Sequence, residues 1–369
     1  MSFLIFSFSS IKVFGEENSL GSSYVEDSII EENALPYGVN HKKIAGLTST
    51  SLKIDVDGLG ELNDLVTPGK LYEQKINLLE IPNSTNIKVT TWANFVGHRW
   101  TLTTVRNLIK DYEAKNPGWK VIAAINADFF DINGNGNLPY QTTGPVVSNG
   151  EFYRTTVGYS MIGFRNDGST ESIVGNKVAS RSSKMALAIY DENDNIIKEF
   201  IIDKVNEYPN DNESSVFFAT YGSDKKIIPV DVKMDGYFVD QAELALPNSA
   251  RDFYGKGVIS SLNAKTISTG QFAIVSNNSE INKYLGLNVK VRVQFEYLGA
   301  YAGIKDLAGC NPVLMYDGKV LESGLRADVM TARHPRTVIG RKADGTIIMM
   351  VIDGRQASKG MYGVDGTEI

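Results

Sequence analysis

Two short apolar runs stand out in the hydrophobic pattern of this chain, at residues 121–125 and 347–352. Each has the length of a strand and is bounded by turn residues, which is typical of strands buried on both faces of a sheet. Each leads into a polar cluster, Asn-Ala-Asp-Phe-Phe-Asp at 126–131 and Asp-Gly-Arg-Gln at 353–356. Because ligands commonly bind where buried strands end, both clusters are candidates for a functional site.

A helix is predicted just before the first apolar run. Four apolar residues recur at the spacing of one helical face: Val105, Leu108, Ile109 and Tyr112. Thr103 or Thr104 can cap the start of this helix, and Asn-Pro-Gly at 116–118 ends it.

The middle of the chain is rich in strands and poor in helices. Residues 185–202 have the pattern of a β-hairpin around a polar turn. Further strands are predicted at 227–232, 272–276 and 289–297. The pattern favours the α+β class, with a mixed, largely antiparallel, β-rich sheet core and few helices. We expect residues 41–369 to form one elaborated domain.

The two ends of the chain have patterns of their own. Residues 1–15 are rich in Phe, Ile and Ser and resemble the remnant of a signal peptide, although a disordered or core-packed start is the alternative. Residues 16–40 are acidic and Ser-rich and are expected to form a flexible leader. Thr367 followed by Glu368 has the pattern of a helix N-cap and first turn, where the chain stops. This end is expected to be either a frayed tail or a domain cut short.

Composition narrows the class of protein. The chain has 369 residues, 42% hydrophobic and 22% charged, which suits one large core or two modest ones. The net charge of -6, without any basic run, argues against nucleic acid as the main partner. One cysteine, Cys310, and three histidines argue against a disulfide framework and a cysteine- or histidine-rich metal site. Beyond the N-terminal segment, no run approaches the ~18 apolar residues that a membrane span needs.

The polar residues after the two apolar runs suit an anionic, phosphorylated substrate. Asp128 and Asp353 supply carboxylates that can stabilise a positive centre or activate water. Arg336 and Arg355 can hold phosphate oxygens in pairs, as guanidinium groups do. His334 can move a proton or donate to phosphate.

Each of these residues also has a structural interpretation. Asp128 can tie a turn, and Asp353 can cap the loop that follows it. Asn126 can bind sugar hydroxyls or orient Asp128, or it can cap backbone groups. The arginines and the histidine can be ordinary surface or loop residues. Phe129 and Phe130 are expected in the core rather than as a stacking platform for a sugar.

One loop has part of the pattern of a calcium site. Asp131, Asn133 and Asn135 place oxygens at positions 1, 3 and 5 of such a loop, and Gly136 stands at position 6. Position 12 is Thr142 instead of a bidentate glutamate. We therefore expect a polar turn rather than a tight metal site. The sequence requires no cofactor, and a need for a divalent cation is left open.

Several motifs, taken in order, resemble the phosphodiester glycosidase family. They are Ala-Ile-Asn-Ala-Asp-Phe-Phe at 124–130, Gly-Pro at 144–145, Asn-Gly-Glu at 149–151, Ala-Gly-Cys-Asn-Pro at 308–312, Asp-Gly-Lys at 317–319, His-Pro-Arg-Thr-Val-Ile-Gly at 334–340 and Asp-Gly-Arg-Gln at 353–356. The resemblance spans the chain from about residue 85. The histidine and aspartate motifs at this spacing are its most specific part.

Members of this family split a sugar from a phosphodiester at the anomeric carbon. Together, the residues and the resemblance give catalytic candidates Asp128, His334 and Asp353, and substrate-binding candidates Asn126, Arg336, Thr337, Gly354 and Arg355. Cys-Asn at 310–311 stands where the family usually has glycines. The family also continues, past the position of Ile369, to an Asn-Leu-Asp-Gly-Gly-Gly-Ser stretch, so the C-terminal end of the domain is expected to be missing.

The resemblance therefore implies an exported bacterial hydrolase that cleaves glycosyl-1-phosphodiester bonds in cell-surface or extracellular glycans. The alternative is a non-catalytic glycan-binding or cell-envelope protein, a truncated or degenerate member of the family. In both cases the expected partner is a glycan or sugar phosphodiester, and the oligomeric state is left open.

Overall fold

The computed structural model forms two compact units. Unit 1 comprises Met1–Ile81, Val320–Gly340 and Ile348–Ile369, and unit 2 comprises Pro82–Lys319 and Arg341–Ile347. The residues that the structure describes are 20–50, 67–96, 99–136, 138–154, 159–175, 183–218, 225–227, 236–245, 254–263, 266–268, 271–297, 301–321 and 332–369.

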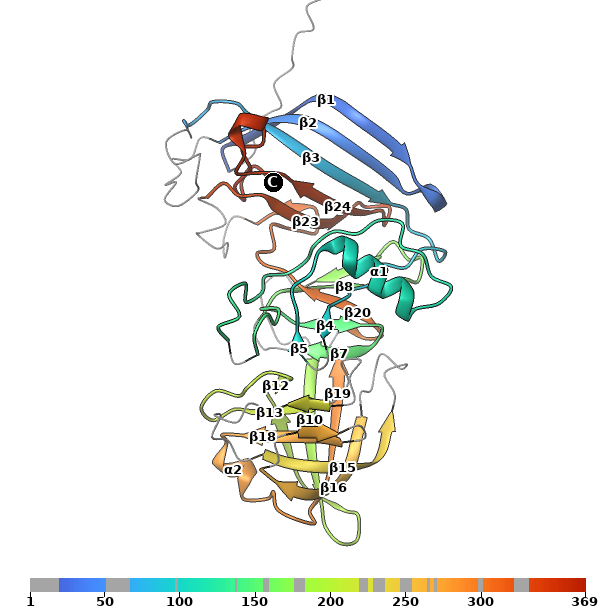
Figure 1. Ribbon diagram of the computed structural model, residues 1–369, viewed down its shortest axis with the longest axis vertical. Coiled ribbons are helices and arrows are strands. Elements are labelled where there is room, and N and C mark those ends of the chain that lie inside the picture. The colour runs from blue at the N-terminus through green and yellow to red at the C-terminus, as the bar shows by residue number, and fades with distance from the viewer. Residues whose placement is uncertain are drawn as a thin grey trace, which may run out of the picture. The chain divides into compact units, whose positions relative to one another are not determined.

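Unit 1 is built on a five-stranded sheet (Figure 1). Its strands, in order across the sheet, are β1 (Ser22–Ala34), β2 (Asn40–Thr50), β3 (Tyr72–Ile81), β24 (Ile347–Ile352) and β23 (Arg336–Arg341). β1 and β2 are antiparallel, as are β2 and β3. Ile44, Ile76, Ile352 and Val364 form a buried cluster of this unit. The sheet thus joins strands from the two ends of the chain.

Two predictions fall in this sheet. The second apolar run is confirmed as β24, and Asp353 follows its last residue. Part of the expected flexible leader is a strand instead, because β1 pairs with β2 along its length. Ile29 and Ile30 of β1 are exposed, so its order comes from backbone hydrogen bonds that the residue pattern does not reveal. The expected signal remnant at 1–15 lies outside the described residues.

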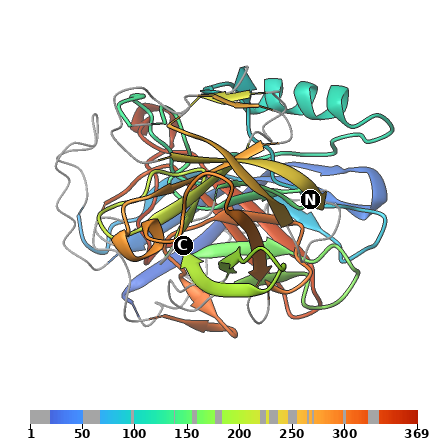
Figure 2. The ribbon, with the colours of Figure 1, turned by 90° about the horizontal axis from the view of Figure 1, so that it is seen from below.

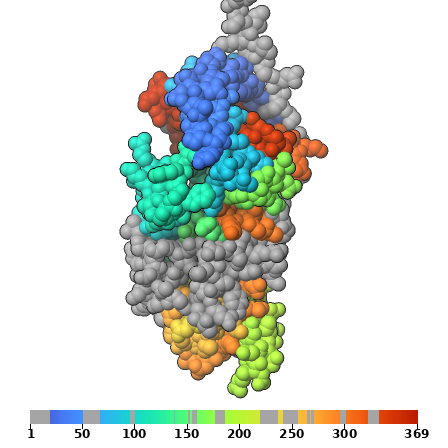
Figure 3. All heavy atoms as spheres, turned by 90° about the vertical axis from the view of Figure 1, so that its right-hand side faces the viewer, coloured from blue at the N-terminus to red at the C-terminus, as the bar shows by residue number. Residues whose placement is uncertain are grey.

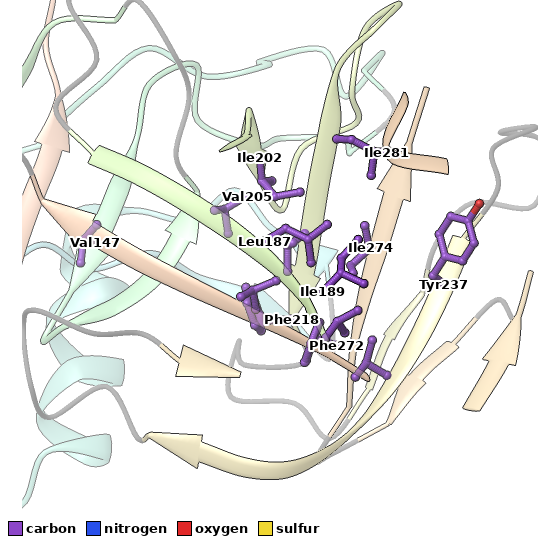
Figure 4. Close-up of a cluster of buried hydrophobic side chains, with 14 of the residues drawn as sticks. Val147, Leu187, Ile189, Ile202, Val205, Phe218, Tyr237, Phe272, Ile274 and Ile281 are labelled. Carbon is purple, nitrogen blue, oxygen red and sulfur yellow. The ribbon is translucent and has the colours of Figure 1, made fainter. Parts of the chain in front are cut away.

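Unit 2 contains an eight-stranded sheet drawn from the β-rich middle of the chain. Its strands, in order, are β11 (Ile196–Ile202), β10 (Ser183–Tyr190), β19 (Lys290–Tyr297), β16 (Tyr254–Leu262), β15 (Gly236–Ala245), β18 (Gln271–Ser276), β13 (Ser214–Phe218) and β12 (Lys204–Val205). Neighbouring strands are antiparallel, except that β12 and β13 are parallel. Leu187, Phe218 and Phe272 lie in its buried core (Figure 4). The predicted hairpin is confirmed as β10 and β11, and two predicted strands as β18 and β19.

A second sheet of unit 2 has five short strands. Its order is β7 (Glu151–Arg154), β6 (Val146–Ser148), β20 (Asp306–Gly309), β8 (Met161–Phe164) and β9 (Ile173–Gly175). The paired short strands are β4 (Phe95–Val96) with β5 (Arg99–Trp100), β14 (Lys225–Ile227) with β17 (Thr266–Ser268), and β21 (Met315–Tyr316) with β22 (Lys319–Val320). The predicted strand at 227–232 overlaps β14 at Ile227, and its other residues lie outside the described ranges.

The predicted helix is confirmed as α1 (Val105–Lys115). The side chain of Thr104 accepts a backbone N–H of the first turn at 3.3 Å, and Asn116 caps the end. The buried Tyr112 meets the ring of Trp92 edge-on, with the ring centroids 5.1 Å apart. Figure 2 shows α1 to one side of the strands of unit 2, and Figure 3 shows the α1 region at the surface.

The first apolar run does not form a strand. Residues 121–125 have no sheet pairing, and Ala123 and Ala124 are exposed. The N–H of Val121 donates to the side chain of Glu113 at 3.0 Å. The prediction of a strand buried on both faces is therefore wrong here. Apolar residues favour burial, but a strand also needs neighbours for its backbone groups, and no strand in the described ranges pairs with this run.

The described part of the chain is mostly β, with largely antiparallel sheets. Its helices are α1 and the short α2 (Ser279–Asn282), with 3-10 turns η1 (Pro36–Gly38) and η4 (Ala357–Lys359). The expectation of a strand-rich core with few helices is confirmed. Within the described ranges, no helix has the length and apolar character that crossing a membrane demands.

Candidate functional site

Three short segments of unit 1, at 333–336, 353–356 and 361–365, bring the two C-terminal motifs together. His334 and Val364 exchange two backbone hydrogen bonds, each 3.1 Å long. A second backbone bridge closes the loop that links the second segment to the third. Main-chain bonds therefore hold side by side residues that are distant in the sequence.

Two glycines allow this close approach. A Cβ added at Gly354 would lie 2.6 Å from the backbone nitrogen of Pro335. One added at Gly363 would lie 2.8 Å from the carbonyl carbon of His334, and the φ of +76° at Gly363 also favours glycine. Gly354, expected among the substrate-binding residues, thus has a packing role in this unit.

Arg355 and His334 form a short polar contact. Nη2 of Arg355 lies 2.6 Å from Nδ1 of His334. A guanidinium group can only donate, so Nδ1 accepts, and the proton of the neutral ring sits on Nε2. Arg355 is exposed, and its backbone has a left-handed φ of 60°. The pair offers a positive charge beside an N–H donor, which are the groups that bind phosphate.

Arg336 uses its guanidinium on the backbone. Its Nε donates to the carbonyl oxygen of Val364 at 3.1 Å, and its Nη2 donates to that of Ala332 at 2.7 Å. In the structure this half-buried side chain ties two chain segments together, and its role in binding phosphate stays a prediction. Thr337, the next residue, is half-buried in β23.

Asp353 lies directly after β24 and is half-buried. Its N–H donates to the carbonyl oxygen of Lys75 in β3 at 2.9 Å, which fixes its backbone against the neighbouring strand. Arg355 follows two residues later, so a carboxylate and a guanidinium belong to one loop. The structure therefore places Asp353 in the same group of segments as Arg355 and His334.

Asp128 lies in unit 2 and has a left-handed φ of 59°. Its Oδ1 accepts the N–H of Phe129 at 2.7 Å, and its Oδ2 accepts that of Gly144 at 2.8 Å. The hydroxyl of Tyr159 lies 3.4 Å from Oδ1. Burial raises the pKa of Asp128 to about 6, against the opposing effect of the backbone hydrogen bonds. The carboxylate is therefore fixed in orientation and titrates near neutral pH.

Sequence reasoning missed the residues that surround Asp128. A Cβ at Gly309 would lie 2.7 Å from Oδ2 of Asp128 and 2.8 Å from Cα of Gly144. Burial, and then the charge of Asp128, raises the pKa of Cys310 to about 12, so this thiol stays protonated. Gly144 and Gly309 both stand in motifs that resemble the family, and this was the signal that the sequence offered. Their packing role against Asp128 is visible only in these contacts.

The residues beside Asp128 are exposed. Asn126 is exposed in unit 2. Phe129 and Phe130 are 48% and 42% exposed, so the expectation that they belong to the core is wrong. Their backbone is tied to residues 142–143 by a bridge and by a 2.7 Å hydrogen bond, which leaves the rings at the surface.

The loop with part of a calcium pattern is closed by its own backbone. Oδ2 of Asp131 accepts the N–H of Gly136 at 2.8 Å, and backbone hydrogen bonds lower the pKa of Asp131. Amide donors thus contact the carboxylate that would face the metal in a calcium loop, as they do in the polar turn that the sequence predicts. Within the described ranges, no three His, Cys, Asp or Glu side chains are grouped so that they could hold a metal ion.

The sequence profile of the phosphodiester glycosidase family matches residues 230–369. That segment contains the site residues of unit 1, among them His334, Asp353 and Arg355, but it does not contain Asp128. None of the curated proteins compared with the chain gives a significant match.

Two solved structures resemble the fold. A hypothetical protein from Synechocystis has a TM-score of 0.59 at 13% identity, over 92% of this chain and 57% of its own. A “putative exported protein” from Burkholderia pseudomallei has a TM-score of 0.57 at 14% identity, over 96% of this chain and 88% of its own. The chain thus spans 57% of the length of the first structure. Over residues 230–369, the chain carries the sequence pattern of the phosphodiester glycosidase family, which confirms the resemblance of the motifs from residue 308 onward, whereas the motifs at 124–151 lie outside the match.

Proposed function

We propose that this chain is a hydrolase of glycosyl-1-phosphodiesters. The observation that carries the proposal is the 2.6 Å contact between Arg355 and His334, inside the segment that matches the phosphodiester glycosidase family. A cation beside an N–H donor suits the phosphate of such a substrate. The carboxylate of Asp353, in the same loop as Arg355, suits the sugar carbon, which becomes positive as the bond breaks.

In the proposed reaction, the bond between the anomeric carbon and a phosphate oxygen breaks. The leaving phosphate monoester keeps the electron pair, and Arg355 stabilises its added negative charge. The Nε2–H of His334 donates to another phosphate oxygen. The oxygen of water bonds to the anomeric carbon, and a proton of that water passes to a carboxylate. Because the phosphate monoester is a good leaving group, a strong general acid is not required.

The two candidate carboxylates differ in their chemistry. Asp353 stabilises the oxocarbenium-like centre. Asp128, in unit 2, has a pKa of about 6 and is a candidate base, because a base with a pKa near the working pH is the most effective. Asn126 binds sugar hydroxyls. Arg336 holds the backbone of the phosphate-binding segments through its bonds to two carbonyl oxygens.

Export to the cell surface or beyond is part of the proposal. It is supported by the Phe-, Ile- and Ser-rich start of the sequence and by the name of the Burkholderia pseudomallei protein with a similar fold. The substrate would then be a cell-surface or extracellular glycan that carries a sugar linked through phosphate.

The arrangement around Asp128 favours a second candidate function, glycan binding without catalysis. Both oxygens of this carboxylate accept backbone N–H groups, and the exposed rings of Phe129 and Phe130 stand beside it. Aromatic rings next to a fixed polar group can hold a sugar without reacting with it. Retained glycan binding with no turnover of any glycosyl phosphodiester would favour this candidate.

The variant Arg355→Ala tests the catalytic proposal. Hexose 1-(methyl phosphate) diesters of both anomers are offered, and the release of methyl phosphate is measured. We expect KM to rise and kcat to fall, with kcat/KM reduced about 10- to 100-fold, because a hydrogen bond to a charged group contributes about 1.5–3 kcal/mol. Arg341→Ala, an exposed arginine later in β23, should leave the kinetics unchanged. Unaltered kinetics of Arg355→Ala would refute the assignment.

A further inference from the structure

A buried ionic cluster lies next to the candidate site in unit 1. Its members are Arg333, Asp365 and Glu368, and all three side chains are buried. Nη2 of Arg333 donates to Oε1 of Glu368. The guanidinium also lies over the ring of Tyr72, with Cζ 4.3 Å from the ring centroid. The cluster therefore joins β3 to two of the segments that build the site.

Asp365 and Glu368 form a capping box. Oδ1 of Asp365 accepts the N–H groups of Thr367 at 2.7 Å and of Glu368 at 3.2 Å. Oε2 of Glu368 in turn accepts the N–H of Asp365 at 3.0 Å. The capping residue is thus Asp365, not Thr367 as the sequence pattern predicted. The turn at 365–368 is fixed by its own bonds, and Arg333 attaches to it.

The cluster is connected to the site through the backbone. Arg333 immediately precedes His334, and Asp365 immediately follows Val364. His334 and Val364 are the two residues of the 3.1 Å backbone bridge, and the carbonyl oxygen of Val364 also accepts Nε of Arg336. Arg333 and the 365–368 turn are thus bonded, through neighbouring residues, to the segments that carry His334 and Arg336.

Such a cluster is a poor source of stability. Removing a guanidinium and two carboxylates from water costs more than their attraction returns unless their polar atoms are well paired. Nε and Nη1 of Arg333 and Oδ2 of Asp365 have no hydrogen-bond partner among the described residues. Apolar side chains would fill this space at a lower cost, so a role in geometry explains the charges better than a role in stability.

We propose that Arg333 and Glu368 are positioning residues of the hydrolase. Their ion pair fixes the register of the His334–Val364 bridge and, through it, the placement of His334 and Arg336. The kinetic consequence rests on the proposed function, whereas the geometric one does not.

The geometric consequence is tested by NMR of protein labelled with nitrogen-15 in its histidines. The chain has three histidines, and the signal lost in His334→Asn identifies His334. The spectra are recorded at pH 8, above the pKa of about 7 of Glu368, so that Glu368→Gln removes a charge. Arg333→Met/Glu368→Met replaces the pair by apolar side chains, a change that buried ion pairs often tolerate. We expect the Nδ1 signal of His334 to shift in both variants and that of His41 in β2 to stay. Glu26→Gln, an exposed change in β1, should shift neither.

Unshifted His334 signals in a folded variant would overturn the proposal, with folding read from the His41 signals and from circular dichroism. If the double variant unfolds, the His334 signals of the single variant Glu368→Gln decide whether the pair positions His334. With a glycosyl phosphodiester, kcat/KM should fall about 10- to 100-fold, as a displacement of roughly 1 Å can cause, and Arg333→Lys should lose less than Arg333→Met. Unchanged kinetics would also overturn it. If the wild-type protein has no turnover, the proposed function fails, and the His334 signals still decide the positioning role.

Discussion

Asp128 and Arg355 share an uncommon backbone, with φ values of 59° and 60°. Few residues other than glycine adopt this left-handed region, although Asp does so more readily than Arg. Such conformations cluster at functional sites, where the surrounding structure enforces them. The backbone at both positions therefore agrees with the roles proposed for their side chains.

Arg355→Gly separates backbone strain from side-chain function. Glycine adopts a φ of 60° without the penalty of a Cβ but gives the unfolded chain more freedom, and these two effects nearly cancel. We expect the free energy of unfolding to stay within about 1 kcal/mol of the wild type, while kcat/KM falls about 10- to 100-fold. Urea denaturation and steady-state kinetics measure the two quantities. A large loss of stability with unchanged kinetics would make Arg355 a structural residue.

Glu368 should make stability depend on pH. Burial is the main cause that raises its pKa from 4.5 to about 7, and the negative charge of Asp365 adds to it, while the guanidinium of Arg333 acts against it. A raised pKa means that its stabilising contribution is complete below about pH 4.5 and is lost as the pH rises through about 7.

The variant Glu368→Gln, whose side chain does not titrate, tests this pH dependence by comparison with the wild type. Between about pH 4.5 and pH 8, the wild type should lose up to about 3 kcal/mol of unfolding free energy relative to the variant, since each pKa unit corresponds to about 1.4 kcal/mol. Urea unfolding at several pH values measures this difference. Parallel pH dependences of the two proteins would contradict the raised pKa.

At the scale of elements, local structures were predictable from the sequence and long-range pairings were not. The helix α1 and the hairpin of β10 and β11 form from neighbouring residues, whose periodicity, cap and turn are all readable. The predictions for β1 and for residues 121–125 were wrong in opposite ways. The polar segment expected to be flexible pairs with β2 as the strand β1, whereas the apolar run expected to be a strand has no partner strand in the described ranges. Neither pairing can be inferred from the residues of the segment itself.

In the candidate site, too, local features were predictable from the sequence and long-range contacts were not. The strand β24 and the loop with Asp353 and Arg355 were predicted, because a buried strand that ends in polar residues is a local pattern. The bond from Arg355 to His334 and the bridge to Val364 depend on three distant segments, so no local pattern revealed them. The use of Arg336 on backbone carbonyl oxygens was hidden for the same reason.

Gly363 tests whether close packing of these segments matters. Gly363→Ala should destabilise the protein by the cost of a left-handed alanine, about 1–2 kcal/mol, plus roughly 1–3 kcal/mol for the contact with the backbone of His334. Gly69→Ala is the matched control, because Gly69 has a φ of +74° but nothing within 4 Å of an added Cβ. Urea denaturation gives both values. Equal losses would show that the segments tolerate a side chain at Gly363.

At the scale of the whole molecule, each compact unit contains candidate functional residues. Unit 1 contains Arg355, His334 and Asp353, and unit 2 contains Asp128. The match to the phosphodiester glycosidase family covers the first three residues and not the fourth. The role of Asp128 therefore rests on its own geometry and titration, and it needs a test of its own.

The pH profile of activity provides that test. If ionised Asp128 is the base, kcat/KM should rise as the pH passes through about 6 and level off above it. Asp128→Asn should lower kcat about 100-fold or more and abolish this rise, because the amide cannot accept a proton. Circular dichroism controls for folding. A variant that keeps both the rate and the rise would remove Asp128 from the mechanism.

The most direct test follows the oxygen of water. Hydrolysis of a hexose 1-(methyl phosphate) diester is carried out in water enriched in oxygen-18, and mass spectrometry locates the label in the products. If the proposed reaction is right, the label enters the sugar hydroxyl at the anomeric carbon and is absent from methyl phosphate. Label in the phosphate product would mean that the phosphorus–oxygen bond is cleaved, which contradicts the proposed reaction.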